Sequence, residues 1–112
     1  MVIIVSSDPR ASARPAEAIR IAAGVGAWKR VDVSLYLRGA AVLALSEFPD
    51  ELVDADNYLQ YLPILGEFGR PVFVQMGSPF FADLGQPALA FQELTDRELA
   101  GLTAKSQCVA RF

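Results

Sequence analysis

The sequence predicts an α/β fold: one three-layer α/β/α domain over residues 1–112, with a mainly parallel sheet of four to five strands. The apolar run Val2–Val5 is followed by a polar turn and an Ala-rich segment from Ser12 to Trp28, an order typical of an opening βα unit. Two further strand-like runs, Val31–Leu37 and Val72–Met76, each follow a segment with helical spacing. No linker or repeat divides the chain, and its length is sufficient for one hydrophobic core.

The first unit has clear boundaries. Val2–Ser6 is expected to be a strand, and Asp8 begins a turn because the residue before a proline avoids helical angles. A helix is expected to begin near Ser12 as its N-cap, with Pro15 tolerated in the first turn. Its polar residues form only a narrow stripe, so the sheet and a neighbouring helix or subunit are expected to cover it on more than one side. This stripe consists of Arg14, Glu17 and Arg20.

The middle of the chain alternates between strand, short helix and loop. Val31–Leu37 has strict alternation, which predicts a strand whose Asp32, Ser34 and Tyr36 face is less fully buried. A turn at Arg38-Gly39 leads to a short apolar helix over Ala40–Ser46, and Pro49–Asp56 is an acidic loop. Helical spacing then runs over Asn57–Phe68. Pro63 predicts a break or kink in that helix, and Gly69 suits its C-terminal end.

The last third of the chain contains the best-defined helix. Val72–Met76 suits a central parallel strand because it is continuously apolar. A brief helical turn near Phe80–Leu84 and a short strand near Ala88–Gln92 are expected in the loop-rich segment that follows. Thr95 and Glu98 form a capping box for a helix that ends at about Ala104. The final strand, Gln107–Phe112, is expected at an edge of the sheet.

Composition excludes several classes of function. The net charge is −3, there is no basic stripe for nucleic acid, and no apolar run is long enough to cross a membrane. The N-terminus lacks the features of a signal peptide. The absence of histidine and the single Cys108 argue against a metal site, a disulfide and a redox pair. We therefore expect a cytoplasmic protein without metal or cofactor, and its many aromatic residues predict a homo-oligomer.

The candidate binding residues follow the predicted strands, because open α/β sheets bind ligands outside the carboxyl ends of their strands. The first loop and the second strand end offer polar and basic groups for an anion near a helix N-terminus, and the third strand end offers a mixed apolar and hydroxyl pocket. The predicted set is Ser7, Asp8, Arg10, Arg14, Arg38, Met76, Gly77 and Ser78.

The candidate residues also have plainer, structural interpretations. The first loop and its arginines are better explained as a solvated polar surface, because polar loops are common at the ends of a sheet. Phe80 and Phe81 are better explained by packing, and Cys108 by a small apolar position in a terminal strand. The acidic loop Asp50, Glu51, Asp54 and Asp56 lacks the spacing of a calcium loop. Its carboxylates are expected to solvate the loop and to cap the following helix.

The chain resembles the DsrE/DsrF-like family of small sulfur-relay-related proteins in five segments. These are residues 2–10, 16–22, 33–42, 69–74 and 109–112. The resemblance implies a cytoplasmic α/β domain that assembles as a homo- or hetero-oligomer. It also implies a cysteine just after the third strand in the sulfur-carrying members. Here that segment reads Val74-Gln75-Met76-Gly77-Ser78-Pro79, so persulfide transfer by the usual route is not expected, and Ser78 without a histidine base is a poor nucleophile.

These observations predict a non-catalytic, homo-oligomeric, DsrE-like protein that binds a small ligand or another protein. Two alternatives remain open at this point. One is a persulfide carrier that uses Cys108, and the other is an anion- or nucleotide-binding regulator that uses Arg10, Arg14 and Arg38.

Overall fold

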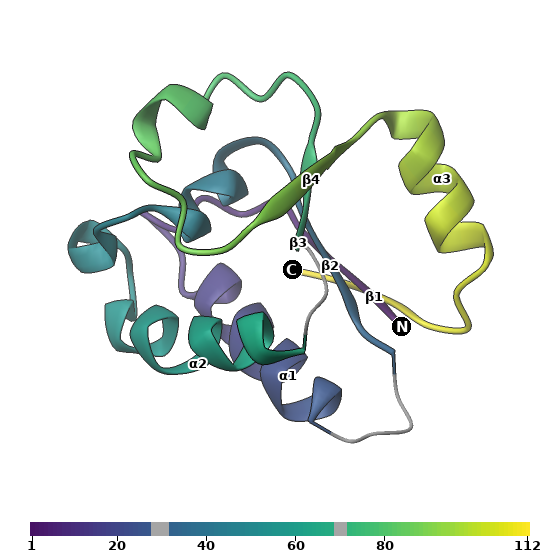
Figure 1. Cartoon of the computed structure of the whole chain (residues 1–112), viewed down its shortest axis with the longest axis horizontal. Helices are drawn as coiled ribbons and strands as arrows, with labels where there is room; N and C mark the ends of the chain where they lie inside the picture. The colour runs from purple at the N-terminus through teal and green to yellow at the C-terminus, as the bar shows by residue number, and fades with distance from the viewer. Residues whose placement is uncertain (28–31, 69–71) are drawn as a thin grey trace.

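A five-stranded parallel sheet forms the centre of the computed structural model, which describes residues 1–27, 32–68 and 72–112. The strand order is β4-β3-β2-β1-β5, and every neighbouring pair is parallel (Figure 1). The predicted fold class is therefore confirmed, with five strands. They are β1 (Val2–Val5), β2 (Ser34–Leu37), β3 (Val72–Gln75), β4 (Phe91–Leu94) and β5 (Val109–Arg111).

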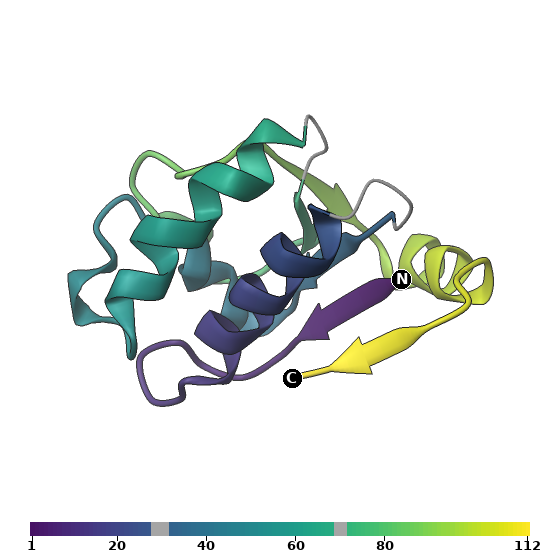
Figure 2. The same cartoon turned by 90° about the horizontal axis from the view of Figure 1, so that it is seen from below.

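The handedness of parallel crossovers explains the placement of the helices. The chain moves from β1 through β2 and β3 to β4 in one direction across the sheet, and then returns past all of them to β5. Because such crossovers are right-handed, the first helices lie on one face and the returning helix lies on the other. Helices α1 (Arg14–Gly26) and α2 (Ala55–Glu67) accordingly lie side by side, and α3 (Asp96–Ala104) lies apart from them (Figure 2).

Two hydrophobic cores result, one on each face of the sheet. The larger core joins the inward residues of the sheet to α1 and α2, and Ile3, Val5 and Ile19 are fully buried in it. The smaller core lies beneath α3 and contains Val2, Ile4, Tyr36, Leu94 and Leu99. Every residue of β1 is consequently buried, which explains its unbroken apolar sequence.

Helix α1 is covered on two sides within one chain, by the sheet and by α2, as its narrow polar stripe predicted. Its start differs from the expectation. The helix begins at Arg14 after Ala13, and the Ser12 hydroxyl accepts a hydrogen bond from the Arg14 amide at 3.1 Å without being the N-cap. Trp28 and Val31 lie outside the described residues, so the predicted ends of this helix and of the next strand are not placed there.

Helix α2 corrects two expectations. It continues from Ala55 to Glu67 through Pro63, where a break or kink was expected. Pro63 is exposed, so its ring does not crowd the core, and the Leu59 carbonyl that loses its helical donor belongs to a solvent-exposed residue. Asp54 precedes the helix in a left-handed conformation (φ 57°) and makes no side-chain capping bond, so the expected cap is wrong at that position. Gly69 lies outside the described residues.

Several smaller differences have physical causes. Tyr36, expected on the less buried face of its strand, is fully buried because α3 packs over that face. The strand expected near residues 88–92 is β4, displaced toward the C-terminus so that its last residue, Leu94, joins the smaller core. The apolar segment after β2 is a 3-10 helix, η1 (Gly39–Leu45), and the brief turns are η2 (Pro49–Glu51) and η3 (Phe81–Asp83).

The C-terminal part matches its expectation closely. Thr95 and Glu98 form the predicted capping box at the start of α3, and β5 lies at the edge of the sheet beside β1. Within the described ranges, the model contains no helix with the length and apolar character needed to span a membrane.

Candidate functional site

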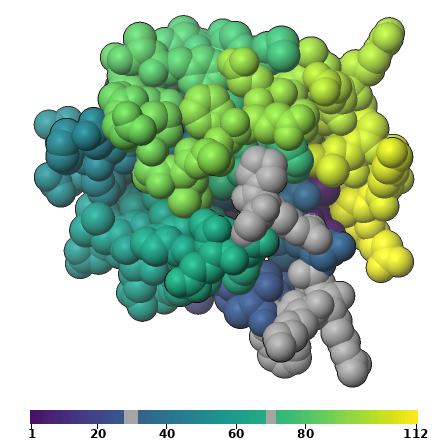
Figure 3. All heavy atoms as spheres, in the orientation of Figure 1, coloured from purple at the N-terminus to yellow at the C-terminus, as the bar shows by residue number. Residues whose placement is uncertain are grey.

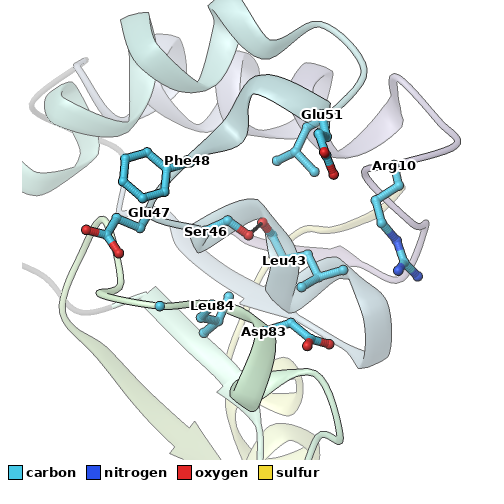
Figure 4. Close-up of a pocket in the computed structure, with 10 residues that line it drawn as sticks. Arg10, Leu43, Ser46, Glu47, Phe48, Glu51, Asp83 and Leu84 are labelled. Atoms are coloured by element: carbon cyan, nitrogen blue, oxygen red, sulfur yellow. Dashed lines mark hydrogen bonds between the residues drawn. The ribbon is translucent and has the colours of Figure 1, made fainter.

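The loops that follow β1, β2 and β3 enclose a crevice with a volume of about 520 Å³ (Figure 4). Arg10 comes from the loop after β1. The segment after β2 supplies most of the lining, and η3 and its neighbours after β3 supply the remainder. The crevice thus lies where a parallel sheet is expected to bind a ligand. The lining residues are Arg10, Leu43, Ser46, Glu47, Phe48, Glu51, Leu52, Asp83, Leu84 and Gly85.

Backbone hydrogen bonds join the walls of this crevice. The Val53 amide donates to the Pro9 carbonyl at 2.9 Å, which ties the segment after β2 to the loop after β1. The Glu47 amide donates to the Leu84 carbonyl at 3.0 Å, which ties the same segment to the end of η3. The three loops are therefore held together before any ligand binds, a property common in small-molecule sites.

A second set of hydrogen bonds, outside the crevice lining, joins the segment after β2 to the segment after β3. The Gly39 amide donates to Gln75 Oε1 at 2.9 Å, and Ser78 Oγ donates to the Gly39 carbonyl at 3.2 Å. The Ser78 hydroxyl also accepts a hydrogen bond from the Phe80 amide at 3.4 Å, and Ser78 is buried. Ser78, predicted as a binding residue, is thus engaged in joining two loops.

Glu47 is held in place by the turn at residues 84–86. Its Oε2 accepts a hydrogen bond from the Gln86 amide at 3.1 Å. Gly85 has a φ of +67°, and a Cβ added there would lie 2.7 Å from the same carboxylate oxygen. This is a position where both backbone angle and space require glycine.

The electrostatic character of the crevice is mainly acidic. Arg10 is its one described cation, and Asp8 binds it through Arg10 Nη2 at 2.8 Å and Nε at 3.1 Å. The hydrogen bond from Arg10 lowers the pKa of the Asp8 carboxyl, and the guanidinium also lies 5.5 Å from the centre of the Phe80 ring. The carboxylate residues Glu47, Glu51 and Asp83 also line the crevice, and Asp8 already neutralises the charge of Arg10.

The other predicted binding residues lie around the crevice and do not line it. Arg14 is exposed at the start of α1, and Arg38 points to α3, where Nη1 lies 3.5 Å from Asp96 Oδ1. Met76 is exposed after β3, Gly77 has a φ of +76°, and Ser7 is half-buried in the loop after β1. Arg10, with its partner Asp8, is thus the predicted group that reaches the cavity.

Cys108 lies at the opposite end of the sheet. It precedes β5, and its carbonyl accepts a hydrogen bond from the Val2 amide at 2.8 Å, at the start of β1. The crevice lies beyond the other end of β1, so the thiol does not contribute to it. Cys108 is exposed and lies just before β5, whereas the sequence favoured a small apolar position within the terminal strand. Among the residues that the structure describes, no cluster of histidine, cysteine or carboxylate groups has a geometry that would hold a metal ion.

Phe80 and Phe81 support the packing interpretation given to them from the sequence. Both are half-buried against the larger core, and Phe81 stacks on Phe91 with ring centres 5.6 Å apart.

The sequence interpretation missed most of the lining, which lies in the segment after β2. Leu43 and Glu51 come from two 3-10 helices that have no sequence motif of their own, and Phe48 lies just before the second of them. One feature of the sequence could have indicated this lining. Glu51 belongs to the acidic loop, which lies in the connection that leaves the carboxyl end of β2.

Comparison with known proteins shows a likeness in fold. The structure of the YchN protein from E. coli superimposes with a TM-score of 0.73, covering 99% of this chain and 97% of that chain at 24% sequence identity. At this identity the likeness shows the fold alone. No protein-family model matches the sequence. No curated protein matches it either.

Proposed function

We propose that this protein is a non-catalytic, DsrE-like binding protein whose crevice beyond β1, β2 and β3 takes a small molecule. The observation that carries the proposal is an open crevice of about 520 Å³ that is bordered by loops from three adjacent strands, and hydrogen bonds join these loops to one another. A cavity of this volume lies within the range of roughly 300–1,000 Å³ typical of small-molecule sites.

The lining selects the chemistry of the ligand. Leu43, Phe48 and Leu52 provide apolar contact area, and the three carboxylates outnumber the single guanidinium. Because Arg10 already pairs with Asp8, the crevice favours a neutral or positively charged group over an anion. We therefore infer a ligand with an apolar body and an amine or another hydrogen-bond donor.

This inference weakens the anion-binding alternative. That alternative needs Arg10, Arg14 and Arg38 to converge on one site, but Arg14 and Arg38 lie elsewhere. Arg38 pairs with Asp96 near α3, and Arg14 does not line the crevice. A phosphate beside Arg10 would also approach the carboxylates of Glu51 and Asp83, which raises the energy of the complex.

The persulfide-carrier alternative has one exposed thiol in its favour. Cys108, however, lies at the amino ends of the strands, away from the crevice, and the chain contains no histidine to serve as a base. Incubation with a sulfane-sulfur donor followed by intact mass measurement tests this alternative. A stable gain of one sulfur atom that disappears in Cys108→Ala would favour it over the binding function.

Isothermal titration with two matched probes tests the proposed function. 4-Phenylbutylamine and 4-phenylbutyrate share one apolar body and carry opposite charges. We expect the amine to bind more tightly than the carboxylate. Glu51→Gln should lower the affinity for the amine by about two- to fivefold, the range that corresponds to an exposed ion pair. The control Glu67→Gln, at the far end of α2, should leave both affinities unchanged. Equal binding of the two probes, or binding of neither, would contradict the proposal.

Self-assembly is a second part of the proposal, and exposed apolar side chains support it. Phe48 is 74% exposed at the edge of the crevice, and Leu59 is 60% exposed on α2. The aromatic residues, from which the sequence predicted assembly, give it less support, because Tyr58 is buried and six others are half-buried within one chain. Those half-buried residues are Tyr61, Phe68, Phe80, Phe81, Phe91 and Phe112.

A further inference from the structure

A groove lies between α2 and the segment 88–89, next to the crevice, and is called the α2 groove below. It is open to solvent and has a volume of about 260 Å³. On the surface, α2 and the segment that leads to β4 adjoin one another (Figure 3). Leu89 lies so close to α2 that a Cβ added at Gly66 would be 3.0 Å from Leu89 Cδ2. The lining is mostly apolar and includes Leu59, Leu62, Pro63, Ala88 and Leu89.

The α2 groove presents apolar surface that the chain itself does not cover. Leu59 is 60% exposed, and Pro63 on the same helix and Ala88 on the opposite wall are also exposed. Residues four apart are neighbours on a helix surface, so Leu59 and Pro63 form one apolar strip along the groove. Contiguous exposed apolar surface is typical of sites where proteins bind one another.

The parts of the chain that form the α2 groove carry only negative charge. Residues 39–68 and 72–90 supply the whole lining and contain no lysine, arginine or histidine. The Glu47 carboxylate lines the groove, and the Gln86 amide holds it there by a hydrogen bond of 3.1 Å. In Figure 4 this carboxylate points away from Arg10, so the cation of the crevice does not pair with it.

Two further carboxylates flank the apolar strip on α2. Asp56 lies three residues before Leu59, and Glu67 lies four residues after Pro63, spacings that make neighbours on the surface of a helix. Both carboxylates are exposed, and neither forms an ion pair with any residue that the structure describes. The α2 groove thus has an apolar centre and an acidic rim, and a partner of complementary character is apolar with positive charges at its edges.

We propose that the α2 groove is a docking site for a basic segment of another protein, in which apolar side chains are flanked by lysine or arginine. The apolar side chains lie against Leu59, and the cations approach Glu47, Asp56 and Glu67. A small molecule fits less well, because the groove is open and smaller than the ~300–1,000 Å³ typical of ligand sites. The docking site goes beyond the function proposed for the crevice. Its lining does not include Phe48, the residue assigned to self-assembly.

Three short peptides test the proposal by NMR titration of the isotope-labelled full chain. The peptide Ac-KKLLKK-amide has both features, Ac-EELLEE-amide inverts the charge, and Ac-KKSSKK-amide removes the apolar centre. We expect the lysine–leucine peptide to cause saturable changes at the amides of Leu59, Leu62, Ala88 and Leu89. Each of the other two peptides should bind more weakly by about fivefold or more, because each loses one of the two contributions to binding.

Two variants locate the contacts, and each has a matched control. Leu59→Ala should lower the affinity for the lysine–leucine peptide by about two- to tenfold, because it removes apolar contact area. Met76→Ala, at a 50% exposed residue after β3, should leave it unchanged. Asp56→Asn combined with Glu67→Gln should lower the affinity by about two- to tenfold, the range of two exposed ion pairs. Glu93→Gln, at an exposed carboxylate that lines neither the crevice nor the groove, should not. All of these residues are exposed, so the variants should retain the fold.

Three results would overturn the proposal. The first is similar affinity for the three peptides, or binding of none of them. The second is a set of amide changes centred on the crevice residues Glu51 and Leu84, together with weaker binding of the lysine–leucine peptide to Glu51→Gln, which would place the lysines in the crevice. The third is a set of changes at Leu59 and Ala88 that follow the concentration of the protein without peptide, which would assign the groove to a second copy of this chain.

Discussion

Thr95 and Tyr58 illustrate two opposite situations for a polar side chain in this protein. Thr95 is exposed and fully used: its hydroxyl accepts a hydrogen bond from the Glu98 amide at 3.1 Å, and Glu98 returns a bond to the Thr95 amide. Tyr58 is buried, and its hydroxyl has no partner. The first arrangement stabilises a helix end, and the second leaves a buried donor unpaired, which lowers stability.

Removing the Thr95 cap should lower stability measurably. Thr95→Ala is expected to reduce the free energy of unfolding by about 1 kcal/mol, because the first turn of α3 loses a partner for a backbone donor. Thr103→Ala in the same helix is the control, since its hydroxyl bonds only to the Ala100 carbonyl within the helix. Urea denaturation of both variants measures the difference. A Thr95→Ala protein as stable as the control would contradict the capping role.

Tyr58 should also make stability fall at alkaline pH. Burial raises its pKa in the folded state, whereas in the unfolded chain the phenol titrates near a pKa of about 10. Its contribution is therefore fully present below pH 10 and is lost as the pH rises further, because ionisation then favours unfolding. Tyr58→Phe should match or exceed wild-type stability at pH 8 and lose less stability than wild type between pH 8 and pH 11. Parallel losses in the two proteins would show that Tyr58 ionises freely in the fold.

At the scale of elements, α1 is buried on two sides. It is packed between the sheet and α2, and Ile19 and Ala22 are fully buried there. This was predictable because a helix with so few polar positions has little surface to expose to water. The course of α2 was not predictable in the same way. Pro63 indicated a break, and whether a proline is tolerated depends on which face of the helix meets solvent.

Charges placed in α1 test its double burial. Ile19→Asp and Ala22→Asp should each reduce the free energy of unfolding by several kcal/mol, because either places an unpaired carboxylate in the larger core. Arg20→Ala is the control, since it removes only an exposed ion pair with Glu17, worth about 0.2–1 kcal/mol. Thermal melting compares the stability of the two aspartate variants with that of the Arg20→Ala control. Aspartate variants that melt within a degree or two of the control would show that α1 is not enclosed.

The limits of sequence-based prediction are clearest at the crevice. The strand ends were predictable from apolar periodicity, and the crevice lies at the edge of the sheet that they indicated. The lining was not predictable, because Leu43, Glu51 and Asp83 are brought together by short 3-10 helices whose positions depend on tertiary contacts. Arg38 was misplaced for a related reason: its direction depends on Asp96, which is distant in the sequence.

At the scale of the whole molecule, the fold places the crevice and the exposed thiol at opposite ends of the sheet. The crevice opens at the carboxyl ends of the strands, and Cys108 lies at their amino ends. Phe48 is exposed at the edge of the crevice, so a partner subunit that covered it would also close part of the binding site. Binding and assembly would then depend on each other, as expected when a ligand site lies at a subunit interface.

Sedimentation velocity tests the proposed assembly. The wild-type protein at micromolar concentration should sediment as a species larger than the monomer, with an interface of at least ~800 Å² per subunit. Phe48→Asp should shift this species to the monomer, because a charge replaces an exposed apolar group at the interface. Lys105→Asp, at the end of α3, is the control and should remain assembled. A monomer at all concentrations would refute the assembly proposal and leave the binding proposal intact.

The central claim is that the crevice beyond β1, β2 and β3 binds a small molecule, and an NMR titration tests it most directly. The labelled protein is titrated with 4-phenylbutylamine, and the change at every assigned amide is measured. The account predicts saturable changes centred on Glu47, Glu51, Leu84 and Gly85, with little change at Asp96 or Val109. Changes centred on α3 or β5, or changes that do not saturate at any residue, would contradict it.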